Sequence, residues 1–457
     1  MDIHKNNQVE TEIEEFLSRV PIRLGVNKYN ELKRLLYEIC LRDSISCGIL
    51  LKNLRLEEII LEGKNDVFHK LKKRLIWARY PSFKGGLKTR ASTLGICRFE
   101  SPSWNGMLSP KKIFIEKSVR NYTWTNDFIY NFPSADIREI ETFRDVEKSL
   151  SKMKHAQRYS ARQDNIFLVK NKDAFIKSCP CTKKYKSCAY WVLNIGFGCP
   201  IDCSYCFLQL YSNSPGIILP ANIEDYYEYI RDFDKRARGK IRIGTGEFTD
   251  SLAFDRYTKY SRLLISFFKE LKYLTLELKT KTSEIGGLLD SAPNDNIVVS
   301  WSMNTDIISD RYERGADTIA ERISAAIKAA RKGYKIGFHF DPIVFYRGWH
   351  ADYKNIIARI FSNNILNNNT AWISLGTLRY TPGLKEVAEE RFFDNRIYYE
   401  GEFFIDDDGK FRYPEEIRKD IYGKMIEWVR AFNKSVWIYL CMEPKEMWSE
   451  LGIQDWK

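Results

Sequence analysis

Two patterns of apolar and polar positions alternate along the second half of the chain. Short apolar runs predict strands, and the stretches between them carry apolar residues at helical spacing, most clearly over residues 317–332. The expected strands lie at residues 190–197, 240–245, 273–279, 297–303, 335–341 and 371–376. Strands that alternate with helices predict a parallel sheet with right-handed crossovers. We therefore expect an α/β fold, a partial (β/α)6 TIM-like barrel whose functional groups lie at the carboxyl ends of the strands.

The first 180 residues follow a different pattern. Apolar residues between Leu32 and Cys40 recur every three to four positions, which predicts an amphipathic helix. Residues 112–116 and 136–140 read as strands, with a helical stretch at 125–131 between them. We expect four parts: a basic, largely helical N-terminal extension over residues 1–105, a small α/β subdomain over 106–180, a core barrel over 181–400, and a C-terminal segment over 401–457 that packs on the core.

The composition narrows the class of protein. The chain of 457 residues carries 72 Lys and Arg against 60 Asp and Glu, so its formal net charge is +12. A basic balance favours polyanionic partners such as nucleic acid, although a solvated Lys-rich surface gives the same count. No apolar run reaches the ~18 residues of a membrane span and residues 1–5 lack an apolar signal segment, so we expect a cytoplasmic protein. Ten Cys then favour metal binding over disulfides.

One basic segment stands out within the N-terminal extension. Residues 67–99 contain nine Lys or Arg and no Asp or Glu, with aromatic residues between the cations. This mixture of cations and stacking planes is typical of nucleic-acid contact. A basic helix over residues 70–80 whose aromatic side chains pack inward is the alternative. The residues expected to contact nucleic acid are Lys72, Lys73, Arg74, Trp77 and Arg79.

Three cysteines directly follow the first expected strand of the barrel. Cys199, Cys203 and Cys206 have the spacing C-x3-C-x2-C. Three thiolates on one short loop suit a metal centre, and iron–sulfur clusters are held by Cys thiolates. With no fourth Cys in the loop, one coordination position stays open, as in catalytic metal sites. A structural zinc ion would require a fourth ligand nearby, and no His lies between His155 and His339.

The spacing, its place after the first strand and the aromatic residue before the last Cys resemble the radical S-adenosylmethionine (SAM) superfamily. The resemblance implies that Cys199, Cys203 and Cys206 hold three irons of a [4Fe–4S] cluster whose fourth iron binds SAM. It also implies that reductive cleavage of SAM gives a 5′-deoxyadenosyl radical that abstracts a hydrogen atom. An external one-electron reductant of the flavodoxin or ferredoxin type follows. The sequence carries no signal for the oligomeric state.

The same resemblance assigns residues near SAM. Tyr205 has the aromatic position that touches adenine, unless it only packs at the end of the strand. Gly246 and Glu247 end a Gly-Thr-Gly-Glu stretch that resembles the motif for the SAM amino group, because a carboxylate suits an ammonium. Lys281 suits the SAM carboxylate, or it is a surface lysine.

The remaining candidates are polar groups near the ends of the strands. Ser302 and Asn304 follow an apolar strand, where they would bind a ribose or carboxylate or make a bond between strands. Weaker candidates are Asp250, His339 and Arg379.

The flanking segments narrow the resemblance to the spore photoproduct lyase family. Similar segments lie at residues 112–116, 204–209, 326–337, 341–343, 348–353 and 378–387, so the resemblance covers about residues 110–450. The best-known members repair a methylene-bridged thymine dimer in DNA without net consumption of SAM. The family therefore implies a lyase that binds damaged DNA.

Two positions depart from the family pattern. Glu247 occupies the position of the Cys that returns a hydrogen atom to the product in the repair enzymes, and a carboxylate O–H is too strong to replace it. Phe207 stands where a second Tyr is expected. Cys179, Cys181 and Cys188 then have three open interpretations: a second metal site together with Cys441, a replacement hydrogen donor, or buried thiols without a redox role.

Three functions remain open from the sequence. The first is a radical SAM enzyme that abstracts hydrogen from nucleic acid, with damaged DNA as its substrate. The second is a diverged radical SAM enzyme that consumes SAM and acts on RNA or a peptide. The third is a non-catalytic Fe–S protein that binds nucleic acid.

Overall fold

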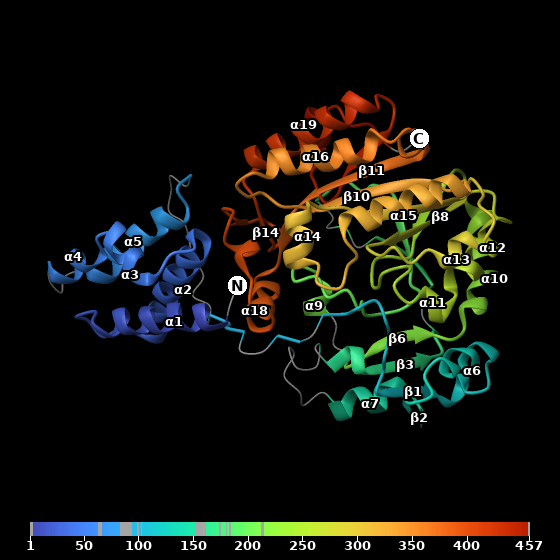
Figure 1. Cartoon of the computed structure of the whole chain (residues 1–457), viewed down its shortest axis with the longest axis horizontal. Helices are drawn as coiled ribbons and strands as arrows, with labels where there is room; N and C mark the ends of the chain where they lie inside the picture. Colours follow the sequence, from blue (N-terminus) through green and yellow to red (C-terminus); the bar gives the residue numbers. More distant parts are fainter. Residues whose placement is uncertain are drawn as a thin grey trace. The chain divides into compact units, whose positions relative to one another are not determined.

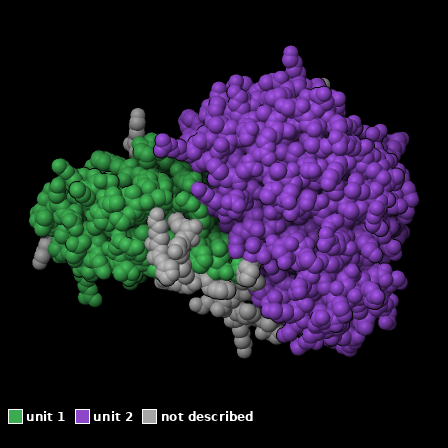
Figure 2. Space-filling view, in the orientation of Figure 1, with its two compact units in different colours: residues 1–101, 379–414 green, residues 102–378, 415–457 purple. Residues whose placement is uncertain are grey.

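The computed structural model describes residues 3–62, 66–82, 94–97, 100–101, 103–150, 159, 161–172, 175–179, 181, 184–211 and 214–455. The chain divides into two compact units. The first comprises residues 1–101 together with residues 379–414, and the second comprises residues 102–378 and 415–457 (Figure 2). This division differs from the expected boundaries, because residues 379–414 leave the barrel and join the N-terminal residues.

Five helices of the N-terminal residues, together with α18 (Pro382–Arg391) and a short antiparallel sheet, build the described part of the first unit. The helices are α1 (Ile3–Ser18), α2 (Val26–Asp43), α3 (Cys47–Asn53), α4 (Leu56–Leu61) and α5 (Val67–Arg79). Residues 379–414 add α18 (Pro382–Arg391) and an antiparallel sheet in the order β12 (Arg379–Tyr380), β14 (Phe411–Arg412) and β13 (Phe404–Ile405).

Buried ion pairs explain why residues 379–414 belong to this unit. Glu38 on α2 accepts hydrogen bonds from Arg79 of α5 at 2.9 Å and from Arg34 at 3.3 Å, and it pairs with Lys385 of α18. Arg34 also donates to Glu389 of α18 at 2.8 Å and 3.1 Å. The two ends of this network lie about 350 residues apart along the chain, so periodicity gives no sign of it.

A small parallel sheet opens the second unit. Its four strands are in the order β2 (Asp136–Ile140), β1 (Lys112–Glu116), β3 (Asn165–Val169) and β6 (Ile217–Pro220). Helices α6 (Thr123–Tyr130) and α7 (Phe143–Leu150) belong to the same part of the chain. Ile113, Ile115, Ile166 and Leu168 are fully buried, which is typical of a parallel sheet.

The larger sheet has eight strands and is the expected α/β half-barrel. Its order is β15 (Trp437–Leu440), β11 (Thr370–Thr377), β10 (Lys335–Ile343), β9 (Ile297–Ser302), β8 (Leu274–Thr280), β7 (Ile241–Gly244), β5 (Tyr190–Leu193) and β4 (Ile176–Ser178). All neighbours are parallel except β4 and β5. The six strands expected from the sequence are present within a few residues. The seventh parallel strand, β15, was not among the expected strands, although it lies in an apolar run over residues 436–442.

Helices cover the outer face of this sheet (Figure 1). The connecting and covering helices are α9 (Leu208–Tyr211), α10 (Tyr226–Arg236), α11 (Asp255–Thr258), α12 (Tyr260–Phe268), α13 (Gly286–Leu289), α14 (Asp306–Tyr312), α15 (Ile319–Lys332), α16 (Trp349–Phe361), α17 (Asn364–Asn369), α19 (Glu415–Phe432) and α20 (Lys445–Glu450). α15 begins at a capping box of Thr318 and Glu321 and ends at Gly333, whose φ of 109° suits glycine. In the described residues no helix is both long and apolar enough to cross a membrane.

Candidate active site in the half-barrel

Arg162 fixes the backbone of the cysteine loop. Its guanidinium donates to the carbonyl oxygen of Cys199 at 2.9 Å and 3.1 Å and to the Asp202 carboxylate at 3.1 Å. Gln209 donates to the same carboxylate at 2.9 Å and to the carbonyl of Cys203 at 3.0 Å. Asp202 has a φ of 59°, which such side-chain bonds help to hold. These protein contacts therefore shape the loop.

The three thiols suit an iron–sulfur cluster by their chemistry and their placement. Cys203 is buried and Cys199 and Cys206 are half-buried. Burial is the main cause that raises the pKa of each thiol, and the three lie near enough to influence one another. A metal centre binds such groups as thiolates. In the described part of the chain no three Cys, His, Asp or Glu side chains are grouped so that they could hold a single metal ion.

A buried carboxylate, Glu313, holds the two side chains that were expected to touch SAM. The Tyr205 hydroxyl donates to it, and the Lys281 ammonium donates to it at 2.8 Å and to the Tyr205 hydroxyl at 3.2 Å. Arg322 donates to its other oxygen at 2.6 Å. Although burial opposes ionisation, the charges of Arg322 and Lys281 lower the pKa of Glu313. Lys281 is thus a paired lysine rather than a surface one.

Sequence reasoning missed Glu313 altogether. It stands in a polar stretch after α14, where an exposed glutamate is the ordinary expectation. The backbone of Gly315, two residues later, lies against Ile201 in the cysteine loop and donates to its carbonyl at 2.8 Å, a contact that the sequence does not signal.

The loop after β7 is held close to the end of β8. Asp250 accepts from the backbone of Leu252, Ala253 and Lys281 and from the Thr280 hydroxyl at 2.7–2.9 Å. These hydrogen bonds join the loop after β7 to the end of β8, so Asp250 fixes the conformation of the loop.

Gly246 in the same loop permits a close approach. A Cβ atom there would lie 2.8 Å from the Cβ of Lys279, so any larger residue would push β8 away. Glu247 follows and is half-buried. No hydrogen bond or ion pair joins its carboxylate to another of the residues described.

Asn304 and Ser302 differ in the hydrogen bonds that they make within the protein. Asn304 donates to the carbonyl of Pro342 at 3.1 Å and accepts from Tyr353 at 2.5 Å and from the backbone of Thr305 at 3.1 Å. Its side chain is therefore bound within the protein. Ser302 is buried at the end of β9, and its carbonyl accepts from Arg322 at 2.9 Å.

The inner face of the half-barrel carries a buried charged group, Glu277 on β8. It accepts from Ser300 at 2.5 Å and Trp372 at 2.9 Å, and a hydrogen bond of 2.6 Å joins it to His339. Although burial opposes ionisation, His339 and Arg242 lower its pKa to about 2. His339 is thus part of the barrel interior rather than of its rim.

Arg242 on β7 lies in an aromatic cage inside the barrel. Four rings lie 4.5–5.4 Å from its guanidinium, namely those of Tyr190, Trp372, Trp437 and Tyr439. Such cation–π contacts stabilise a buried cation. The interior of the half-barrel is therefore packed, and open space for a ligand must lie toward the carboxyl ends of the strands.

The second cysteine group reaches this inner face. The sulfurs of Cys179 and Cys181 lie 3.5 Å apart, and Cys188 accepts from Arg242 at 3.5 Å. Cys441 follows β15 and, like Glu247, lies near enough to influence the Cys179 thiol. Cys179 therefore lies close to Cys181, Cys441 and Glu247. Phe207 is 38% exposed and packs on Tyr211.

Arg379 and the residues of α5 that were expected to contact nucleic acid lie in the first unit. Arg379 is on β12, outside the barrel. Arg79 is only 1% exposed, and three of its N–H donors go to Glu38 and to the carbonyls of Gly401 and Tyr398, so its guanidinium is buried within the first unit instead of lying on a surface. Lys72 pairs with Glu31 at 2.7 Å.

The exposed side of α5 retains part of the expected basic surface. Lys73 lies 4.8 Å from the ring of Trp77, which is 57% exposed, and Arg74 donates to the carbonyl of Leu54 at 3.2 Å.

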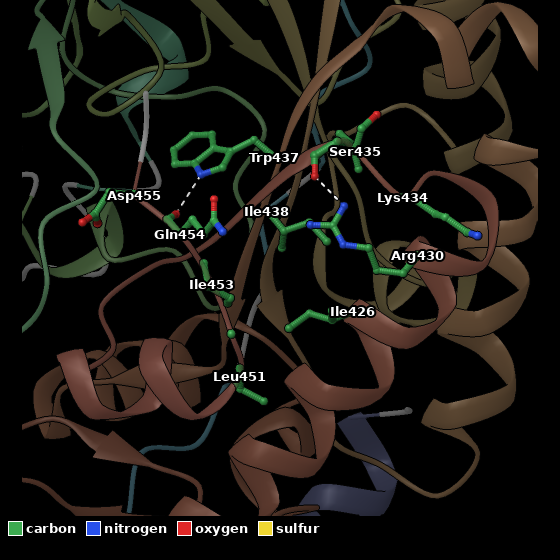
Figure 3. A pocket seen from close by; sticks show the side chains of 12 residues that line it. Ile426, Arg430, Lys434, Ser435, Trp437, Ile438, Leu451, Ile453, Gln454 and Asp455 are labelled. Carbon is green, nitrogen blue, oxygen red and sulfur yellow. Dashed lines mark hydrogen bonds between the residues drawn. The ribbon is translucent and has the colours of Figure 1, made fainter.

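A cavity of about 500 Å³ lies elsewhere, where α19, β15 and residues 451–455 meet (Figure 3). Arg430 closes one side by donating to the carbonyl of Val436 at 2.6 Å, and Trp437 donates to the carbonyl of Gln454 at 3.0 Å. None of the expected site residues lines it.

Comparison with known proteins agrees with this geometry. The profile of the family described as spore photoproduct lyase matches residues 108–437. A spore photoproduct lyase of Clostridium acetobutylicum is 22% identical over 340 residues, which cover 72% of this chain and 98% of that protein. The Bacillus subtilis enzyme of the same name is 24% identical over 290 residues, covering 62% of this chain and 82% of that protein.

Solved structures show the same fold. Spore photoproduct lyase complexed with dinucleoside spore photoproduct has a TM-score of 0.63 at 22% identity, covering 73% of this chain and 99% of that chain. A double mutant of spore photoproduct lyase with bound AdoMet (SAM) and dinucleoside spore photoproduct also has a TM-score of 0.63, at 21% identity and the same coverage. The first hundred residues of the chain lie before the region matched by the family profile.

Proposed function

The chain belongs to the spore photoproduct lyase family, and we propose that it is a radical SAM enzyme that abstracts hydrogen from a nucleic-acid substrate, with a DNA photoproduct as the substrate class. The observation that carries this proposal is the loop of Cys199, Cys203 and Cys206 at the carboxyl end of the first parallel strand of a half-barrel. This is the edge of the fold where parallel α/β barrels place their chemistry.

The cofactors of the proposed reaction are a [4Fe–4S] cluster and SAM, held at this loop. Cys199, Cys203 and Cys206 would be the cluster ligands. When bound, the pair supplies one-electron reduction and hydrogen abstraction. The electron comes from an external reductant of the flavodoxin or ferredoxin type.

The side chains around the loop position these groups. Arg162 and Gln209 hold the loop backbone, and Glu313 fixes Tyr205 and Lys281 beside it. A half-buried carboxylate without a partner among the described residues suits an ammonium group, so Glu247 is our candidate for the amino group of SAM.

Of the other residues expected to contact SAM, two remain candidates for direct contact and one takes a positioning role. Ser302 and the backbone of Gly246 remain candidates for direct contact with SAM. Asn304 acts by positioning the end of β10, because its own hydrogen bonds are made within the protein.

The test of the substrate is repair of dinucleoside spore photoproduct by the reconstituted enzyme with reductant and SAM. Formation of the two unlinked thymines supports the proposal. Cleavage of SAM without repair would favour the second candidate, an enzyme that consumes SAM on RNA or a peptide. The observation that favours this second candidate is Glu247, which cannot return a hydrogen atom as a thiol does.

The thiols of Cys179, Cys181 and Cys188 bear on the choice between DNA repair and a reaction that consumes SAM. The place of Cys179 next to Glu247 supports a role of these thiols as hydrogen donors or as ligands of a second metal, and iron content separates the two. The exposed side of α5, with Lys73, Arg74 and Trp77, is our candidate for an additional nucleic-acid contact.

A further inference from the structure

Lys279 places a cation near the carboxyl end of β8, toward the mouth of the half-barrel. On β8 alternate side chains face the same way, and Glu277 faces the interior, where it bonds to residues of β9, β10 and β11. Lys279 lies two residues nearer the carboxyl end and faces the same way. Its side chain runs over Gly246, since a Cβ atom on that glycine would lie 2.8 Å from its Cβ and 3.2 Å from its Cε.

Lys279 and Lys281 have different surroundings although they are only two residues apart. Lys281 is bound to Glu313 and Tyr205 at 2.8 Å and 3.2 Å. The ammonium of Lys279 makes no hydrogen bond or ion pair with any residue in the described ranges, and its side chain is only half-buried. Although burial opposes the charge, the carboxylates of Glu247, Glu277 and Asp341 raise the pKa of Lys279. Lys279 therefore stays charged and reachable.

Asp341 faces the same space from β10. It lies two residues beyond His339, as Lys279 lies two residues beyond Glu277, and His339 and Glu277 are hydrogen-bonded to each other in the interior. Its carboxylate is near enough to Lys279 to influence that ammonium. β8 and β10 flank β9 in the sheet, so the two residues lie on strands that have one strand between them.

An ammonium and a carboxylate that lie near each other, as in Lys279 and Asp341, favour a ligand that offers both a hydrogen-bond acceptor and a donor. A phosphate would meet Lys279 but would be repelled by the carboxylates of Glu247 and Asp341. A neutral ring that carries a carbonyl oxygen next to an N–H meets both, because the ammonium donates to the oxygen and the carboxylate accepts from the nitrogen. The Watson–Crick edge of thymine has this arrangement, and enzymes that act on a base read that edge by hydrogen bonds.

We propose that Lys279 and Asp341 read the edge of a thymine base at the mouth of the half-barrel, with Lys279 donating to a ring carbonyl and Asp341 accepting from the ring N–H. This rests on the proposed function and names the residues that give it specificity.

Binding of two probes to the full-length protein with its reconstituted cluster tests the pair. The probes are dinucleoside spore photoproduct and its N3-methylated analogue, which lacks the ring N–H. Hydrogen bonds to charged groups contribute enough that we expect Lys279→Met to weaken binding of the first probe about tenfold or more. Lys279→Arg keeps a donor and should restore most of the affinity.

The matched control is Lys272→Met, which removes the same charge just before the amino end of the same strand, where Lys272 is exposed. It should bind the probe like the wild type. Wild-type protein should prefer the unmethylated probe by about tenfold, and Asp341→Asn should reduce that preference.

Equal affinities of the Lys279→Met and Lys272→Met variants would overturn the inference, and so would a wild-type protein that does not distinguish the two probes. Wild-type protein that binds neither probe and forms no 5′-deoxyadenosine would instead remove the proposed function itself. The two failures are therefore separable.

Discussion

Replacing Glu313 by Gln should destabilise the second unit and disorder the surroundings of the cysteine loop. The carboxylate is fully buried and receives hydrogen bonds from Tyr205, Lys281 and Arg322. The amide keeps the shape but removes the charge, which leaves the fully buried Arg322 and the 14% exposed Lys281 without their counter-ion. Removing one partner from a buried ion pair typically costs about 3–5 kcal/mol.

Thermal unfolding of the cluster-free protein measures this cost. A domain of this size loses about 2 °C in Tm per kcal/mol, so Tm should fall by ~6–10 °C. Glu228→Gln is the control, because Glu228 is an exposed carboxylate on α10 of the same unit. If the Glu313 and Glu228 variants unfold within about 1 °C of each other, Glu313 is not the buried hub that the geometry indicates.

Three further predictions concern the cluster, the first unit and the surface of α5. Wild-type protein should contain about four irons per chain after reconstitution, Cys203→Ser should lose most of them, and Cys181→Ser should keep them. Glu38→Gln should destabilise the first unit by about 3 kcal/mol near neutral pH, because the pKa of Glu38 is lowered from 4.5 to about 2 as the charges of Lys385, Arg79 and Arg34 outweigh its burial. A carboxylate with a lowered pKa stabilises the fold above its unfolded pKa, so the difference between wild type and variant should shrink as the pH falls from about 5 toward 2. Lys73→Gln should reduce the dependence of DNA binding on salt by about one ion, and Trp77→Ala should weaken binding to single strands.

Each of these predictions has an outcome that contradicts it. About eight irons per chain, with a loss in Cys181→Ser, would show a second cluster. A Glu38 variant whose deficit in unfolding free energy is the same at pH 3 and pH 6 would mean that the native pKa is not lowered. For α5, Lys52→Gln on α3 removes an exposed cation from the same unit. Equal effects of Lys52→Gln and Lys73→Gln on DNA binding would mean that Lys73 contributes only through the net charge of the unit and not through a contact of α5 with DNA.

The sequence predicted the half-barrel because its strands are fully buried apolar runs. Residues such as Ile243, Leu276, Val299 and Phe338 are 0% exposed, and runs of this kind are legible without any tertiary information. The cysteine loop was equally legible, because its meaning depends on spacing within eight residues. β15 was not predicted, although it lies in an apolar run over residues 436–442, because periodicity alone does not separate a short apolar strand from a buried helical segment.

Charged residues were the weak point of the prediction, because a sequence shows a charge but not the group that faces it. Arg79 was counted as a surface cation, yet its partner Glu38 lies 41 residues earlier and both are buried. The partner of Lys281, Glu313, lies 32 residues later and was not anticipated. Arg162 was not singled out at all, although it holds the loop through the carbonyl of Cys199.

The central claim is that the cysteine loop starts radical chemistry, and formation of 5′-deoxyadenosine tests it most directly. The reconstituted protein is incubated with SAM and a strong reductant without oxygen, alongside the Cys203→Ser variant. The account predicts 5′-deoxyadenosine from the wild type and none above background from the variant. Wild-type protein that holds about four irons per chain and yields no 5′-deoxyadenosine, with or without dinucleoside spore photoproduct, would contradict it.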